Sequence, residues 1–167
     1  QKEGCRILDE FGVWYREYAE GYYIASSIET VAKLTAGVIE AGAEIINLVT
    51  VEDVMIREDE KIAGLVINWE AVERTRLHVD PLSVRAKVVI DGTGHDANIC
   101  EVVQRKIPGA KVGSLGVVGE KPMWADVGEK TVVEVTQEVY PGLIAAGMAA
   151  AAVAGGHRMG PIFGGML

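Results

Sequence analysis

The sequence lacks several residue patterns that define whole classes of protein. Only two of its 167 residues are cysteines, Cys5 and Cys100, so it has neither a disulfide framework nor a CxxC zinc motif. No run of about 20 apolar residues is available to span a membrane. There is no GxGxxG after an expected strand and no Gly-x-Ser-x-Gly elbow for a hydrolase nucleophile. These absences favour a reduced, cytoplasmic protein that is not membrane-bound.

Basic charge is also scarce. Lysine and arginine total 16 against 24 acidic residues, which gives a formal net charge of −8. A nucleic-acid-binding protein needs a basic stripe to face the phosphate backbone, so no nucleic-acid partner is expected. Hydrophobic residues at 49% and charged residues at 24% are typical of a globular protein rather than of a disordered or fibrous one.

Glycine is the one residue type in excess, at 20 residues against the ~12 that average usage predicts. Twelve of them fall in residues 107–167. The chain opens on Gln1 and stops on Leu167 inside a glycine-rich run, whereas domain ends are usually polar and exposed. We therefore expect residues 1–167 to be part of a longer polypeptide. If the domain binds a dinucleotide, its pyrophosphate loop lies outside the given sequence.

Hydrophobic periodicity predicts an α/β fold with a mixed sheet. Ser26 and Glu29 have the spacing of a capping box, and the helix that follows should end at Gly42. A hairpin is predicted around a polar turn at 58–61, with the second arm covered on both faces. The remaining expectations are strands at 43–50, 83–91, 132–135 and 143–146 and a long loop at 108–122, with 70–80 left unassigned.

Two histidines and a carboxylate form the first group of candidate site residues. In an extended segment His78 and Asp80 would face the same side. His95 follows an expected strand directly, where ligands bind in open α/β sheets. Two histidines and one carboxylate are also the ligands of a facial iron site. The competing interpretation is a surface His78 and a loop-capping His95.

The second candidate is Arg158, the only formally charged side chain from Val139 to Leu167. Its guanidinium is a planar fork that matches a carboxylate or phosphate, and the surrounding glycines allow the backbone to approach a ligand. A helix starting at Ile162 would add free N–H groups for an anion. The alternative is an ordinary glycine turn with one solvated arginine.

Specific motifs make the sequence similar to a known family. They are Asp91-Gly92-Thr93-Gly94-His95-Asp96, Pro141-Gly142-Leu143, Gly147-Met148-Ala149 and Arg158-Met159-Gly160-Pro161-Ile162-Phe163-Gly164-Gly165-Met166, supported by Gly21-Tyr22-Tyr23, Leu77-His78-Val79-Asp80-Pro81 and Lys121-Pro122-Met123-Trp124-Ala125. Together they resemble the thiamine thiazole synthase family in its archaeal-type branch. The resemblance covers nearly the whole chain.

The resemblance implies a flavoprotein-like FAD/NAD(P)-binding (Rossmann-type) fold, of which residues 1–167 would be a single, incomplete dinucleotide-binding-type domain. It implies synthesis of an adenylated thiazole from NAD, glycine and sulfur with ferrous iron. Asp80 and His95 would ligate Fe(II). One arrangement has the two residues contributed by adjacent subunits of a ring-like homo-octamer. Arg158 would hold the glycine carboxylate. The positions that match contacts to NAD or its derivatives are Val51, His78, Val79, Asp80 and Met148.

His78 distinguishes the branches of that family. The fungal and plant branch carries a cysteine at this position and gives up its own sulfur, so each protein turns over once. Because this chain has His78, and because Cys5 and Cys100 lie elsewhere, we expect free sulfide to be the sulfur source and His78 to belong to the catalytic site of a true transferase.

Two other functions remain open at this point. One is a flavin- or NAD-binding oxidoreductase of the same fold, which a yellow flavin spectrum would reveal. The other is a non-catalytic ligand-binding relative, which would bind an adenylated ligand without iron. We also expect weak or absent NAD binding by the isolated 167-residue chain, because the resemblance places the phosphate loop before Gln1.

Overall fold

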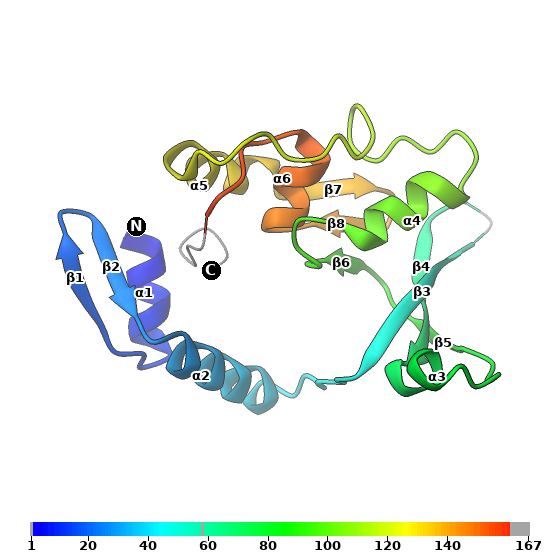
Figure 1. Ribbon diagram of the computed structural model, residues 1–167, viewed down its shortest axis with the longest axis horizontal. Helices are drawn as coiled ribbons and strands as arrows, with labels where there is room; N and C mark the ends of the chain where they lie inside the picture. Colours follow the sequence, from blue (N-terminus) through cyan, green and yellow to red (C-terminus); the bar gives the residue numbers. More distant parts are fainter. Residues whose placement is uncertain (1, 58, 161–167) are drawn as a thin grey trace. The chain divides into compact units, whose positions relative to one another are not determined.

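The structure is a computed structural model that describes residues 2–57 and 59–160. Spatial proximity divides the described residues into two compact units, one up to residue 47 and one from residue 48 onward. The first unit contains α1 (Lys2–Glu10), the antiparallel hairpin β1 (Tyr15–Ala19) and β2 (Tyr22–Ala25), and α2 (Ser27–Glu40). Figure 1 shows these elements in blue.

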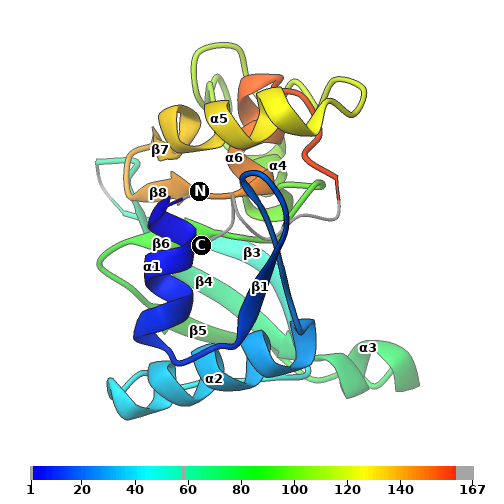
Figure 2. The same ribbon diagram turned by 90° about the vertical axis from the view of Figure 1, so that its left-hand side faces the viewer.

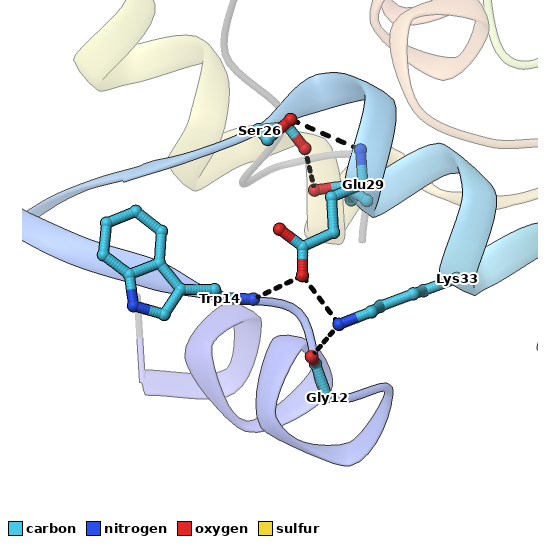
Figure 3. Close-up of polar contacts among 6 residues, drawn as sticks. Gly12, Trp14, Ser26, Glu29 and Lys33 are labelled. Carbon is cyan, nitrogen blue, oxygen red and sulfur yellow. Dashed lines mark hydrogen bonds and ion pairs between the residues drawn. The ribbon is translucent and has the colours of Figure 1, made fainter.

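Ser26 caps the start of α2 as predicted, because its side chain accepts a hydrogen bond from the Glu29 backbone N–H at 3.4 Å. Gly42 follows the end of the helix with a φ of +83°, also as predicted. The reciprocal half of the capping box is absent. The Glu29 carboxylate instead accepts from the Trp14 backbone N–H at 3.1 Å and from Lys33 at 2.6 Å (Figure 3). Glu29 therefore connects α2 to the segment before β1.

The second unit contains two three-stranded sheets. The first is an antiparallel sheet in the order β3 (Val49–Ile56), β4 (Ile62–Trp69), β5 (Leu82–Arg85). The second is mixed, in the order β6 (Val89–Asp91), β8 (Leu143–Ala145), β7 (Gln137–Tyr140). In it β6 runs parallel to β8, and β7 runs antiparallel to β8. The predicted hairpin and mixed sheet are therefore confirmed.

Four helices complete this unit: α3 (Glu70–Thr75), α4 (Asn98–Lys106), α5 (Ala125–Val135) and α6 (Met148–Ala154). Figures 1 and 2 show α4 and α6 beside the mixed sheet, with α5 packed on α6. The core lies between these helices and the sheet. Its members are mainly small or β-branched: Val89, Ile99, Cys100, Val103, Leu143, Ala149, Ala152 and Val153. The alanines of α6 permit close packing because they add almost no side-chain volume.

The antiparallel sheet joins the mixed sheet at the start of β4. The Ile62 N–H donates to the Pro141 carbonyl at 2.8 Å. Gly142 lies against the same turn with a φ of +80°, and a Cβ there would be 2.4 Å from the Ile62 carbonyl oxygen. Only glycine fits at this contact. The junction fixes β8, and with it the parallel strand β6, relative to the hairpin.

Three predicted strands are wrong. Residues 43–47 form no strand, and Ile45 and Ile46 are 53% and 57% exposed. No strand of the described residues pairs with this segment, and an apolar run without a partner cannot complete its backbone hydrogen bonds. The chain turns at Leu48, whose φ is +54°, before β3 begins.

The expected strand at 83–91 is two strands in different sheets. The Ala86 N–H still bonds to Ala63 of β4, whereas the Val89 N–H bonds to Gly142 beside β8. Apolar residues continue across the bend between them, so periodicity does not reveal it. Residues 132–135 belong to helix α5, where Gly128 and Val132 are buried at a spacing of four on one helix face. Packing of that face overrides the strand preference of the valines.

Candidate functional site

The end of β6 is held by a fully buried carboxylate. Asp91 Oδ1 accepts hydrogen bonds from the Thr93 N–H at 2.9 Å and the Thr93 hydroxyl at 2.7 Å. Its Oδ2 accepts from the Cys100 N–H at 2.9 Å. These three donors compensate for the burial of Asp91. They also tie both ends of the loop from β6 to α4, which carries His95.

His95 contacts an acidic side chain that sequence reasoning missed. Its Nδ1 lies 2.5 Å from Oε2 of Glu120. The Glu120 side chain is only 9% exposed, whereas that of His95 is 34% exposed. Residues 25 positions apart form this pair, and no local motif around Glu120 signals it. Only the fold, which places the 108–122 loop beside the β6–α4 loop, brings the two together.

The segment after Glu120 runs beside the tail that carries Arg158. Lys121 and His157 form an isolated parallel bridge. The Lys121 N–H donates to the Gly156 carbonyl at 2.8 Å, and the Arg158 N–H donates to the Lys121 carbonyl at 3.2 Å. The Trp124 N–H then donates to the Arg158 carbonyl at 3.1 Å. The backbone of Arg158 is thus fixed, while its side chain is exposed.

Met148 also lies at the His95 loop. It begins α6 directly after β8, the strand parallel to β6. A Cβ built on Gly94 would be 3.8 Å from the Met148 methyl carbon, so the residue before His95 faces this side chain. Loops at the carboxyl ends of two parallel strands therefore meet, as the open-sheet rule predicts.

The His78–Asp80 segment lies in another part of the second unit. It connects α3 to β5 without regular structure, and all three side chains are exposed. The Asn68 side-chain amide donates to the Val79 carbonyl at 3.4 Å and to Glu52 at 3.0 Å. Val51 is half-buried on β3, paired with Ile67 beside Asn68. Val51 and Val79 are thus gathered at one end of the β3–β4 hairpin.

The predicted ligands Asp80 and His95 lie on separate segments, since Asp80 precedes β5 and His95 lies between β6 and α4. Within residues 2–57 and 59–160, no three His, Cys, Asp or Glu side chains are grouped so that they could hold a metal ion. His95 alone still fits a ligand's role, because metal-binding histidines commonly donate their other ring N–H to a carboxylate.

The two cysteines are free thiols. Cys100 is fully buried on α4, and burial, followed by the negative charge of Asp91, raises the pKa of its thiol. A thiol held in its neutral form is a poor nucleophile. The structure therefore gives no support for Cys100 as a reactive sulfur.

The helix expected from Ile162 lies outside the described residues. In the described part of the chain, no helix combines the length and apolar character that crossing a bilayer requires.

The fold and these loops define a class of protein: an α/β chain of the flavoprotein-like, Rossmann type that gathers polar side chains at the carboxyl ends of parallel strands. Comparison with known proteins gives the family. The model of the Thi4 family matches residues 1–163, and the chain belongs to that family.

Individual relatives agree with this assignment. The chain is 72% identical to thiamine thiazole synthase from Methanothrix thermoacetophila and 68% identical to that from Methanococcoides burtonii. Both alignments cover all of this chain, which spans 64% and 65% of those relatives' lengths. The crystal structure of Thermovibrio ammonificans THI4 matches with a TM-score of 0.94 at 50% identity, covering 99% of this chain and 65% of that one. The predicted family and fold class are confirmed.

Proposed function

We propose that the protein containing this chain is a thiamine thiazole synthase, a transferase that builds an adenylated thiazole from NAD, glycine and sulfide with Fe(II). The observation that carries the proposal is the junction at residues 119–124. Glu120 contacts His95, and the next residues bond to the backbone on both sides of His157. Arg158, a cation that can bind a substrate carboxylate, and His95, a histidine that can bind a metal, thus both lie next to this junction.

Arg158 is assigned to the glycine carboxylate. Its planar guanidinium can donate two parallel hydrogen bonds to both carboxylate oxygens. The fixed backbone at Arg158 reduces the freedom lost on binding, while the exposed side chain stays accessible. Removal of the guanidinium should raise the KM for glycine more than the KM for NAD.

Asp80 and His95 are assigned to Fe(II). When bound, ferrous iron supplies a Lewis acid with open coordination positions. Because no three His, Cys, Asp or Glu side chains are grouped to hold a metal within the described residues of one chain, we assign the two residues to adjacent subunits of a homo-octamer. Mixing inactive Asp80→Ala and His95→Ala subunits tests this arrangement, because mixed interfaces would restore some complete sites and recover part of the activity.

Val51, His78, Val79, Asp80 and Met148 are assigned to NAD and the intermediates derived from it. The gathering of Val51 and Val79 at one end of the β3–β4 hairpin supports a shared role for these two residues. His78 is assigned to the catalytic site because it is exposed next to them. The buried, neutral thiol of Cys100 supports an external sulfur source, and the two free cysteines favour a reducing, cytoplasmic setting.

The test counts product per protein. The complete protein is incubated anaerobically with NAD, glycine, Fe(II) and sulfide, and the adenylated thiazole is quantified by mass spectrometry. We expect several thiazoles per chain, an unchanged protein mass, and no product without sulfide. A yield no greater than one per chain would overturn the sulfide-dependent catalyst. A flavin spectrum without thiazole formation would overturn the synthase assignment itself.

A further inference from the structure

Glu120 is an unusual glutamate because it is nearly buried while it contacts a partly exposed histidine. Oε2 approaches His95 Nδ1 to 2.5 Å, whereas Oε1 is buried and forms no hydrogen bond within the described ranges. Burying a carboxyl group with an oxygen that has no hydrogen-bond partner costs free energy, which the single contact with His95 only partly offsets. Stability of the loop alone is therefore a poor explanation for this residue.

The contact determines the chemistry of the histidine ring. We take the Glu120 carboxylate as the acceptor in this contact, which makes the His95 Nδ1–H the donor. In the neutral ring this leaves the lone pair on Nε2. The part of the chain that the structure describes supplies no hydrogen-bond partner for Nε2, and a third of the side chain is exposed. In this tautomer, Nε2 is free to bind a metal ion.

The geometry points to Glu120 as the positioning residue of His95: it selects the tautomer with a free Nε2 and fixes the ring for metal binding. This inference rests on the proposed function, because it takes His95 as an Fe(II) ligand. Glu120 itself does not touch the metal or substrate. It acts through the ring, in the way that carboxylates behind metal-binding histidines orient them and increase their basicity.

The backbone around Glu120 supports this role. The Gly119 N–H donates to the Ala152 carbonyl of α6 at 2.9 Å, and Lys121 bonds to Gly156. The glutamate is thereby held from both sides against the tail, while Asp91 holds the loop of His95. Two independently fixed segments meet at the hydrogen bond, which makes the ring orientation reproducible.

The first measurement is the tautomer of His95 in the complete, metal-free protein. Histidine is labelled with ¹⁵N, and solid-state magic-angle-spinning NMR at a pH where the ring is neutral assigns the proton-bearing nitrogen, with His95→Gln identifying the signal. We expect Nδ1–H in the wild type. Glu120→Ala should shift the population toward Nε2–H. A wild-type ring that carries its proton on Nε2 would overturn the inference.

The second measurement is metal affinity, with Co(II) as the spectroscopic probe. The visible absorption of bound Co(II) is titrated in the wild type, Glu120→Ala, Glu120→Gln and the control Glu129→Gln, a partly buried glutamate of α5. We expect Glu120→Ala to weaken Co(II) binding by about 10–100-fold. Glu120→Gln, which keeps a hydrogen-bond acceptor, should fall between it and the wild type, and Glu129→Gln should leave affinity unchanged.

The outcomes separate this inference from the proposed function. If His95→Gln binds Co(II) as tightly as the wild type, the metal assignment of the proposed function is wrong, and the tautomer still reports on Glu120. If His95→Gln loses binding but Glu120→Ala does not, the positioning role is wrong. Thermal unfolding of each metal-free variant is the control for folding. The positioning role would also be contradicted if Glu120→Gln weakened Co(II) binding as much as Glu120→Ala does.

Discussion

At the scale of single residues, Cys100 shows how burial removes a reactive group. Its thiol lies in the core of the second unit, beside the carboxylate of Asp91. Burial first, and then the charge of Asp91, raises the pKa of this thiol. We expect Cys100 to resist iodoacetamide in the native protein at pH 9, where an ordinary thiol is largely ionised. Peptide mapping measures the labelling, with the partly exposed Cys5 as internal reference.

The raised pKa of Cys100 also determines how its contribution to protein stability changes with pH. The folded state keeps the Cys100 proton at a pH where the unfolded chain, with a thiol pKa of about 8.5, has lost it. This contribution to stability is therefore complete below about pH 8.5 and decreases as pH rises. Labelling of native Cys100 as fast as that of Cys5 would contradict both statements.

Gly128 tests the packing of the tail against α5. A Cβ at Gly128 would lie 2.7 Å from the His157 carbonyl oxygen, next to Arg158. Alanine favours a helix over glycine by up to about 1 kcal/mol, but the clash costs about 1–3 kcal/mol. We expect Gly128→Ala to lower the free energy of unfolding in urea.

The matched control is Gly4→Ala in α1, where nothing lies within 4 Å of the added carbon. It should be neutral or stabilise the protein by a few tenths of a kcal/mol. If the two substitutions had equal effects, the tail would not be packed on Gly128. Impaired glycine use by Gly128→Ala would further link this contact to Arg158.

At the scale of elements, Glu29 connects α2 to the chain before β1. A hydrogen bond from the Lys33 side chain, and next one from the Trp14 backbone N–H, lower the pKa of this carboxyl. Lys33 also donates to the Gly12 carbonyl (Figure 3). The unfolded carboxyl has the higher pKa, so the stabilising effect is complete above about pH 4.3 and is lost as pH falls through the folded value.

Glu29→Gln should therefore unfold at a lower temperature than the wild type at pH 7, and this difference should close as the pH falls from about 5 to 3. Circular dichroism at a series of pH values measures the two midpoints. Glu20→Gln, an exposed substitution, is the control. A constant difference across the pH range would show that the carboxylate charge has no part in the contact.

Elements with a local signal were predictable from the sequence. Ser26 and Gly42 delimit α2 because caps act over a few residues, and the polar turn between β3 and β4 marks the hairpin. Residues 43–47 and α5 were not predictable, because pairing and packing with distant segments decide them. No sequence prediction covers the hairpin β1–β2, strand β7 or the helices α1, α3, α4 and α6. The same reason hid Glu120, since its partner His95 is distant in sequence.

At the scale of the whole molecule, apolar side chains on and beside β6 are exposed. Ile90 of β6 is 64% exposed, and Val88 before it is 47% exposed. Exposed apolar patches mark surfaces that other parts of a protein cover. We expect the isolated 167-residue polypeptide to bind a hydrophobic dye more strongly than the complete protein, as dye fluorescence per mole would measure.

NAD binding should show the opposite order. The isolated polypeptide lacks a GxGxxG phosphate loop, so calorimetry should detect weak or absent NAD binding. The complete protein is the positive control in the same buffer. A micromolar dissociation constant for the isolated polypeptide would show that these 167 residues suffice for the nucleotide site.

The bridge between Lys121 and His157 gives the molecule a built-in reporter. The amide protons of Lys121 and Arg158 point to carbonyls of each other's segments, so both are released only when the two segments separate. Their exchange with deuterium therefore measures one opening event rather than two. A ligand that binds Arg158 would therefore slow amide exchange at Lys121 without contacting it. Exchange at Lys121 thus reports whether a ligand is bound at Arg158.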